Sequence, residues 1–147
     1  MLQSGVALTL AAAGTAIAQS DKPAAGHDHH HHDHGSSGKY GDLVHAAAEC
    51  GHIGQVCVAH CLVLLGQGDK VMAVCATSVS QTLAACDALL KLSTQNSKYV
   101  PKMAALALAV CEDCEKECRK HESKHKECKD CADACAACAR ECKKVAA

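Results

Sequence analysis

The stretch KHKECKDCADACAACARECKK, residues 124–144, repeats a cysteine at every third or fourth position. Its cysteines are Cys128, Cys131, Cys135, Cys138 and Cys142. At about 100° per residue they fall within about 80° of one another around an α-helix. A seam with this spacing normally holds Leu, Ile or Val. Here it holds thiols, which favours a helix that binds a soft metal.

Three more helical segments precede this one, at about residues 41–65, 69–93 and 101–121. Asp69 is a suitable N-cap for the second segment, and Pro101 suits the first turn of the third. Short loops between helices of about 20 residues make successive helices antiparallel. The sequence therefore predicts an all-α fold, an antiparallel up-down-up-down four-helix bundle over residues 40–147.

Each of these helices has one narrow stripe of sulfur. The remaining cysteines are Cys50, Cys57 and Cys61, then Cys75 and Cys86, then Cys111, Cys114 and Cys118. The chain has no Trp or Phe and only two Tyr, so large aromatic rings do not fill its core. Neutral cysteine packs like a small hydrophobic residue. We therefore expect all 13 thiols to line the bundle interior.

Residues 1–18 contain no charged side chain, and Ala16-Ile17-Ala18 has the pattern of a cleavage site. We interpret them as a signal peptide, because the stretch is too short and too rich in Ala and Gly for a good membrane anchor. The mature chain is then exported to a periplasmic or extracytoplasmic location without membrane insertion. The net charge of -1 gives no electrostatic reason to expect binding to nucleic acid.

Residues 19–39 are rich in Asp, Lys, Pro, Gly and Ser and include a histidine tract from His27 to His34. This composition builds no core, so we predict a disordered His-rich linker. The tract has two interpretations, a native segment for low-affinity metal capture or an expression tag. Its Asp interruptions favour the native segment.

Disulfide bonds are one alternative for the cysteines, and export would favour them. Thirteen is an odd number, however, and neighbours on one helix point alongside one another rather than toward one another. Zinc or an iron–sulfur cluster is a second alternative, suggested by Cys111-x-x-Cys114 and Cys128-x-x-Cys131. One straight helix supplies few ligands to a tetrahedral ion, and the spacing from Cys128 to Cys138 differs from that of ferredoxins.

Cu(I) suits the pattern best, because soft thiolate ligands select it. Buried thiolates alone are costly, whereas each Cu⁺ cancels the charge of one thiolate. Empty sites are neutral thiols that pack as apolar groups, so we expect the metal-free protein to stay folded, unlike a zinc finger. Cysteines that merely fill space are the plainest alternative, but thirteen of them on inward stripes argue against it.

Over about residues 40–147 the chain resembles the bacterial copper storage proteins. The motifs are Cys57-x-x-His60-Cys61, Met72-x-x-Cys75, Cys111-x-x-Cys114-x-x-x-Cys118 and Glu127-Cys128-x-x-Cys131-x-x-x-Cys135-x-x-Cys138-x-x-x-Cys142. The resemblance implies a bundle that stores multiple Cu(I) ions, in a homo-oligomer that is often a tetramer. It also implies that exported members hold copper for a copper-dependent enzyme or carrier. Family members of this type place His and Met at one open end, and His60 and Met72 match those positions.

The predicted topology agrees about that end. In an up-down-up-down bundle the first and third loops, at residues 66–68 and about 120–126, lie together. That end would hold His60, Met72, His121 and His125. We expect copper to enter there, with His60 and Met72 as metal ligands beside the 13 cysteines. For His121 and His125, ligation and plain surface exposure are equally good interpretations.

The resulting hypothesis is a non-catalytic, exported protein that stores Cu(I) for copper enzymes and for detoxification. A thiol redox protein that exchanges disulfides is an alternative, but it would need one activated, exposed thiol. A copper chaperone is another, and it would hold one or two ions on a surface Cys-x-x-Cys motif rather than fill a core.

Overall fold

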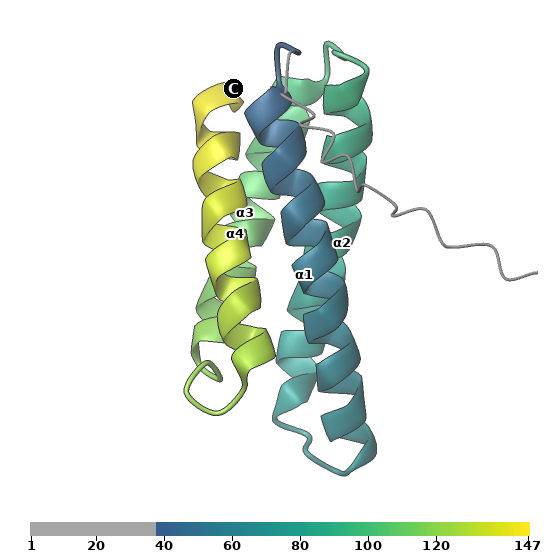
Figure 1. The fold of residues 1–147 in the computed structure, drawn as a ribbon, viewed down its shortest axis with the longest axis vertical. Coiled ribbons are helices and arrows are strands. Elements are labelled where there is room, and N and C mark those ends of the chain that lie inside the picture. Colours follow the sequence, from purple (N-terminus) through teal and green to yellow (C-terminus); the bar gives the residue numbers. More distant parts are fainter. Residues whose placement is uncertain (1–37) are drawn as a thin grey trace, which may run out of the picture. The chain divides into compact units, whose positions relative to one another are not determined.

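The computed structural model describes residues 38–147, which fold into four α-helices (Figure 1). The helices are α1 (Gly41–Gly66), α2 (Met72–Thr94), α3 (Val100–Arg119) and α4 (Lys126–Val145). No strand occurs in this part of the chain, and the all-α prediction is confirmed. The predicted signal peptide and nearly all of the predicted linker lie outside the described residues.

Each helix packs against two neighbours, so that α1, α2, α3 and α4 form a closed ring. α1 contacts α2, and α3 contacts α4, more extensively than the other two neighbouring pairs. The α1–α2 and α3–α4 loops lie at one end of the bundle, and the α2–α3 loop lies at the other (Figure 1). This arrangement is the predicted antiparallel up-down-up-down bundle.

Two helices begin later than the sequence suggests. Gly68 adopts a φ of 94°, the left-handed conformation that glycine accepts without strain, and the turn that follows it delays α2 to Met72. Asp69 does not cap α2; its Oδ1 accepts a hydrogen bond from the Val71 N–H at 3.2 Å within the turn. α4 begins at Lys126, after a turn in which the His125 N–H donates to the His121 carbonyl at 3.0 Å.

Gly54 sets the close approach of α1 to α2. A Cβ atom at this position would lie 2.9 Å from Leu83 Cδ2 and 3.7 Å from Val79 Cγ1. The first distance is shorter than the separation at which carbon atoms attract one another. A side chain at Gly54 would therefore require either the Leu83 side chain to shift or α1 and α2 to move apart.

Cysteines are the main component of the core. Thirteen of its 26 buried apolar residues are cysteines, and most of the others are small. Four of the larger buried side chains gather at the end that holds the α2–α3 loop: Tyr40, Leu43, Leu89 and Val100. Leu89 is fully buried there. This end is consequently the better sealed of the two.

Candidate metal centre

All thirteen cysteines are buried and free in residues 38–147. Each lies on the inward face of its helix, as the helical spacing predicts. Two sulfur pairs lie 3.7 Å apart, Cys61 with Cys75 and Cys75 with Cys118, and each pair joins two helices. These separations exceed a disulfide bond of about 2 Å and fit thiols that share a metal ion or a hydrogen bond.

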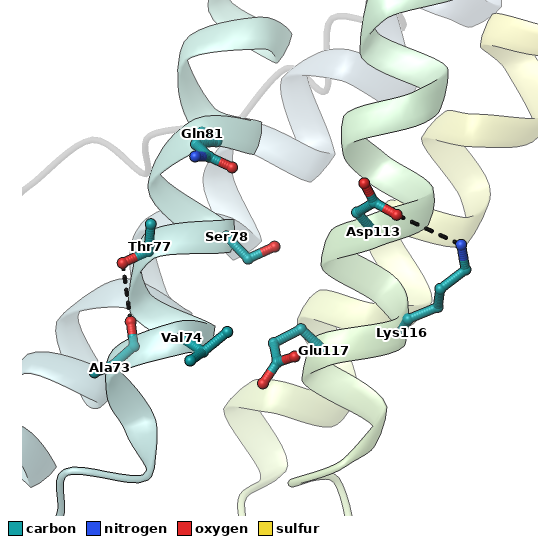
Figure 2. Close-up of a pocket in the computed structure, with 8 residues that line it drawn as sticks. All are labelled: Ala73, Val74, Thr77, Ser78, Gln81, Asp113, Lys116 and Glu117. Atoms are coloured by element: carbon teal, nitrogen blue, oxygen red, sulfur yellow. Dashed lines mark hydrogen bonds and ion pairs between the residues drawn. The ribbon is translucent and has the colours of Figure 1, made fainter.

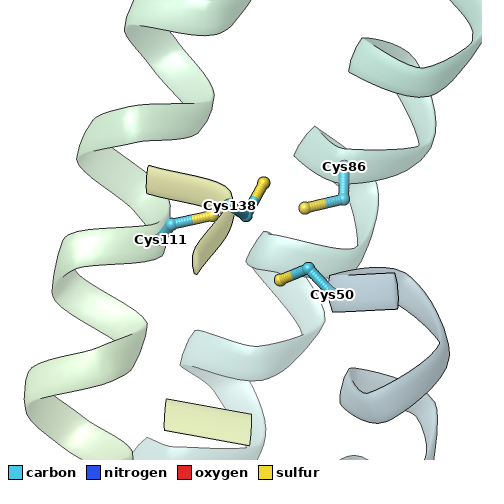
Figure 3. A group of neighbouring side chains, drawn as sticks. All are labelled: Cys50, Cys86, Cys111 and Cys138. Atoms are coloured by element: carbon cyan, nitrogen blue, oxygen red, sulfur yellow. The ribbon is translucent and has the colours of Figure 1, made fainter. Parts of the chain in front are cut away.

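At the better sealed end, one cysteine from each helix points to a common centre. Cys50, Cys86, Cys111 and Cys138 come from α1, α2, α3 and α4, and Figure 3 shows their thiols converging. The four sulfur atoms all lie within 4.8 Å of one another. No single helix could supply this arrangement, which depends on the axial alignment of all four.

A second group of four sulfurs lies nearer the loops at the other end, and two groups of three lie between. They are Cys57, Cys61, Cys75 and Cys128; Cys57, Cys118 and Cys131; and Cys114, Cys131 and Cys135. Within each group the sulfurs lie within 4.8 Å of one another. Cys57 and Cys131 each belong to two groups, so these sites are connected.

The groups join into one column of sulfur along the bundle. Cys135 Sγ lies 3.8 Å from Cys50 Sγ, which links the three connected groups to the sealed end. Cys142 extends the column, with its sulfur 4.0 Å from that of Cys138. A metal ion bound at any group therefore has another set of thiols within reach of a short step.

Some thiols are disposed to lose their proton. Hydrogen bonds from Cys111 and Cys135 lower the pKa of Cys50 from about 9 to about 5. Hydrogen bonds from neighbouring thiols also lower the pKa values of Cys75, Cys131 and Cys138. Each of the four sulfur groups contains at least one of these residues. Because the thiolate is the form that binds metal, every group offers a starting ligand.

Other thiols are held in the neutral form. Burial, and after it the neighbouring Cys75 sulfur, raise the pKa of Cys61 from about 9 to about 12. The pKa of Cys128 is also about 12. A hydrogen bond with Cys57 lowers this pKa, but a hydrogen bond with Cys75 and burial raise it by more. These thiols ionise when a metal ion replaces the proton.

The end opposite the seal carries a small polar cluster above the sulfur column. His60 of α1 and His125, the residue before α4, are joined by a hydrogen bond of 3.0 Å between Nε2 and Nδ1. Glu127 Oε2 lies 3.7 Å from His60 Nε2. Met72, at the start of α2, is buried. We call this end the mouth, and the structure brings His60, His125 and Met72 to it.

His121 is placed differently from His60. Its Nε2 atom is buried, lies 3.6 Å from Glu117 Oε1, and has no hydrogen-bond partner within residues 38–147. It is therefore not the solvated surface residue that was one of its two interpretations.

Sequence reasoning did not find the charged residues that hold the mouth together. Arg119 contacts Glu115 at 3.2 Å, Glu122 at 2.9 Å and Asp133 at 2.7 Å, which ties α3 to the following loop and to α4. The first two partners lie four and three residues away along the chain, a spacing that predicts ion pairs on a helix. The contact with Asp133 depends on the packing of α3 against α4.

A surface groove with a volume of about 550 Å³ lies elsewhere, between α2 and α3 (Figure 2). Its lining includes Val74, Gln81 and Glu117, together with an ion pair of 3.5 Å between Asp113 and Lys116. No cysteine or histidine lines it. The groove is therefore separate from the sulfur column, which lies inside the bundle.

Known proteins are similar to the part of the chain that contains the cysteines. The copper storage protein family model, Csp, matches residues 36–147. The structure is similar to the Cu(I)-bound copper storage protein BsCsp3, with a TM-score of 0.63 and 27% sequence identity, over 71% of this chain and 95% of that one. No curated protein matched the sequence. The chain belongs to the copper storage protein family.

Proposed function

We propose that this protein stores multiple Cu(I) ions on cysteine sulfurs inside its four-helix bundle. The observation that carries the proposal is the connected column of buried thiols, in which each group of sulfurs lies within 4.8 Å. Cu⁺ prefers thiolate ligands, and one positive charge for each thiolate keeps a filled core close to neutral. The related protein BsCsp3 is Cu(I)-bound, which supports the same cargo here.

The proposed ligands are the thirteen cysteines, with His60 and Met72 at the mouth. His60 is only partly exposed and adjoins Cys61, so an ion held by its imidazole is next to the first buried thiols. The thioether of Met72 is a soft ligand that binds Cu(I) without first losing a proton. Copper would enter here and move inward by exchange between neighbouring sulfurs.

We further propose a non-catalytic role, in which bound copper is detoxified or passed to a copper-dependent enzyme or carrier. The thiols are uniformly buried, which suits storage better than disulfide exchange by one exposed, activated cysteine. We also infer that the chain is exported and forms a homo-oligomer, as the resemblance to exported family members implies. Cleavage after residue 18, found by mass spectrometry of periplasmic protein, would test the export.

Titration of the reduced chain with Cu(I) against a competing chelator tests the storage function. About ten or more tightly held ions are expected, on the order of one per buried sulfur. One or two ions would indicate a chaperone instead, and none would leave structural or redox thiols. The variant with Cys50, Cys86, Cys111 and Cys138 replaced by Ser should lose roughly a third of the capacity, because the other groups keep their ligands.

A further inference from the structure

Two of the four sulfur groups contain three thiols rather than four, and both lie in the middle of the column. One of them joins Cys57 of α1, Cys118 of α3 and Cys131 of α4, and we call it the three-helix triad. Its sulfurs lie within 4.8 Å of one another, and all three residues are buried. The other takes its sulfurs from α3 and α4 alone: Cys114, Cys131 and Cys135. Because both groups contain Cys131, a centre that needs three sulfurs can occupy only one of them at a time.

In the described part of the chain, α2 supplies no thiol to these two groups. Val79 and Thr82 are buried on the inward face of α2, between Cys75 and Cys86. The Thr82 hydroxyl donates to the Ser78 carbonyl at 3.1 Å within the same helix, so its proton is already engaged. The three-helix triad is therefore a three-sulfur site, and the fourth helix of the bundle closes it with uncharged side chains.

The charge of a bound centre decides which centre suits three buried thiolates. Their three negative charges are costly to bury without compensation. A single Cu⁺ in the triad leaves two of these charges, and Zn²⁺ leaves one, so both ions depend on neighbouring ions or protons. A trivalent centre with an affinity for sulfur cancels all three charges and depends on no neighbour. Trivalent arsenic is such a centre, because it binds three thiolates and has a lone pair in place of a fourth ligand.

We propose that the three-helix triad binds trivalent arsenic, which reaches it as arsenous acid. This acid is small and uncharged at neutral pH, so it enters a buried site without the desolvation cost of an ion. Each thiol exchanges its proton for a bond to arsenic, and the proton leaves with an arsenic hydroxyl as water. A thiol that is already ionised releases hydroxide instead. Three As–S bonds replace three As–O bonds, arsenic stays trivalent, and the product is neutral, so the exchange needs no oxidant or reductant.

The four-sulfur groups meet the same requirement with any three of their sulfurs. The group at the sealed end (Figure 3) then keeps one thiol in its neutral form. The group nearer the mouth keeps three sulfurs when Cys57 serves the triad: Cys61, Cys75 and Cys128. Two four-sulfur groups and one of the two groups of three give about three arsenic atoms per chain. The sharing of Cys131 sets this number, since thirteen thiols contain enough sulfur for four.

Mass spectrometry of the reduced, metal-free, full-length chain, mixed with excess arsenite, tests the proposal. About three arsenic atoms are expected per chain, each in place of three hydrogens, because three As–S bonds leave no hydroxyl on arsenic. Cys131→Ser removes a ligand from both groups of three and should lower the number to about two. Cys142→Ser is the matched control, since Cys142 belongs to none of the four groups found within residues 38–147. The control should keep about three arsenic atoms.

Thermal unfolding, followed by circular dichroism, shows whether the folded chain holds the arsenic. Arsenic in the triad ties α1, α3 and α4 together, so arsenite should raise the melting temperature by about 5 °C or more. The rise should be smaller for Cys131→Ser than for Cys142→Ser, and the helical signal before heating shows that both variants fold. An unfolded chain also offers thiols, and a preference of arsenic for that state would lower the melting temperature.

The pH of a weakly buffered solution gives an independent measurement. Arsenous acid carries its own hydroxyls, so its binding releases no net proton and the pH should not fall. Cu⁺ carries no hydroxyl and displaces the proton of each neutral thiol that it binds, so the pH should fall when copper is added instead.

Each of five results would overturn the proposal: no bound arsenic, arsenic that retains a hydroxyl, an unchanged number of arsenic atoms in Cys131→Ser, a lowered melting temperature, or a fall in pH on addition of arsenite. The proposal does not depend on copper binding, and no copper is present when mass and melting temperature are measured with arsenite. A chain that binds copper but no arsenic would keep the storage function and lose this proposal, so the two failures are distinct.

Discussion

At the scale of single residues, the cysteines differ from one another although the sequence makes them look alike. Hydrogen bonds from neighbouring thiols lower the pKa of Cys50 to about 5, whereas burial first of all raises that of Cys61 to about 12. The difference arises from which sulfurs meet across the bundle. Within each group, a metal ion is therefore expected to bind first to the thiol that ionises readily.

The raised pKa values predict that the metal-free protein loses stability in alkali. Cys61 and Cys128 ionise near 12 in the folded chain and near 9 when unfolded. Their stabilising contribution is complete below about pH 9 and is lost as the pH rises toward 12. The midpoint of urea unfolding for the reduced metal-free chain should fall between pH 8 and about 11.

Cys50 makes an opposite contribution, since its pKa of about 5 is lower than its unfolded value near 9. That contribution is present above pH 9 and is lost as the pH falls toward 5. The copper-loaded chain is the control, because its sulfurs are already deprotonated and the alkaline loss should be absent. An equal loss of folding stability at alkaline pH with and without copper would contradict the assignment of this loss to the cysteine thiols.

His60 at the mouth should affect the rate of copper uptake rather than its extent. His60→Ala removes an imidazole next to Cys61 and its hydrogen bond of 3.0 Å to His125. Uptake measured by stopped-flow absorbance should slow roughly tenfold, the effect of about 1.4 kcal/mol on the barrier. The number of ions bound should change by no more than one.

His52→Ala is the matched control for this rate, since His52 is an exposed histidine on the outer face of α1. Its uptake rate should equal that of the unsubstituted chain. Equal slowing by both variants would show that histidine charge, rather than ligation at the mouth, governs entry.

At the scale of helices, two glycines of α1 should respond to alanine in opposite ways. A Cβ at Gly51 meets nothing within 4 Å, so Gly51→Ala should raise the free energy of unfolding by about 0.5–1 kcal/mol through helix propensity. At Gly54 the same atom would lie 2.9 Å from Leu83 Cδ2. The shift that this contact forces on Leu83 or on α2 should cancel or exceed the gain in propensity.

Urea unfolding of both variants measures these two stability changes, and the number of copper ions bound is a second readout. Gly51→Ala should keep its full capacity. Gly54→Ala should be less stable than Gly51→Ala by about 1 kcal/mol or more. Equal stabilisation by the two substitutions would mean that Leu83 moves aside freely.

The helices themselves were predictable, because cysteines at helical spacing mark their inward faces and short loops separate them. The start of α2 was not, since Asp69 suggested an N-cap but instead accepts a hydrogen bond from Val71 in a turn. The inward direction of every sulfur also followed from helical spacing. Which sulfurs meet did not: Cys50 and Cys135 lie 3.8 Å apart but 85 residues apart in sequence, and only the alignment of α1 with α4 determines that contact.

At the mouth, too, the sequence did not determine which side chains meet between helices. His60 and Met72 were expected at this end from the order of the loops. The contact between Arg119 and Asp133, at 2.7 Å, was not, because it depends on how far α3 and α4 slide past each other. Local spacing predicts faces of helices, and tertiary packing selects the partners across them.

At the scale of the whole molecule, copper should stabilise a fold that already exists without it. The buried cysteines and the residues that seal one end give the metal-free chain a packed core. Ions that bind the folded state add about 2.7 kcal/mol for each site at one hundred times the dissociation constant. The melting temperature should therefore rise by more than about 10 °C when the chain is loaded with Cu(I).

Far-UV circular dichroism of the reduced metal-free chain, heated with and without Cu(I), makes this measurement. Helical signal at 25 °C without metal is expected. An unfolded metal-free chain would show that the sulfur core does not hold without its ions, and an unchanged melting temperature would place the copper outside the bundle.

Half of the buried apolar residues are cysteines, and this feature constrains how the protein can change over evolutionary time. Most bundles drift freely, because Leu, Ile and Met replace one another in a core at little cost. Here an exchange at any cysteine position deletes a binding position, and each added cysteine alters the volume that must be filled. Natural selection for copper binding and natural selection for core packing therefore act on the same cysteine side chains, so a change in one property also changes the other.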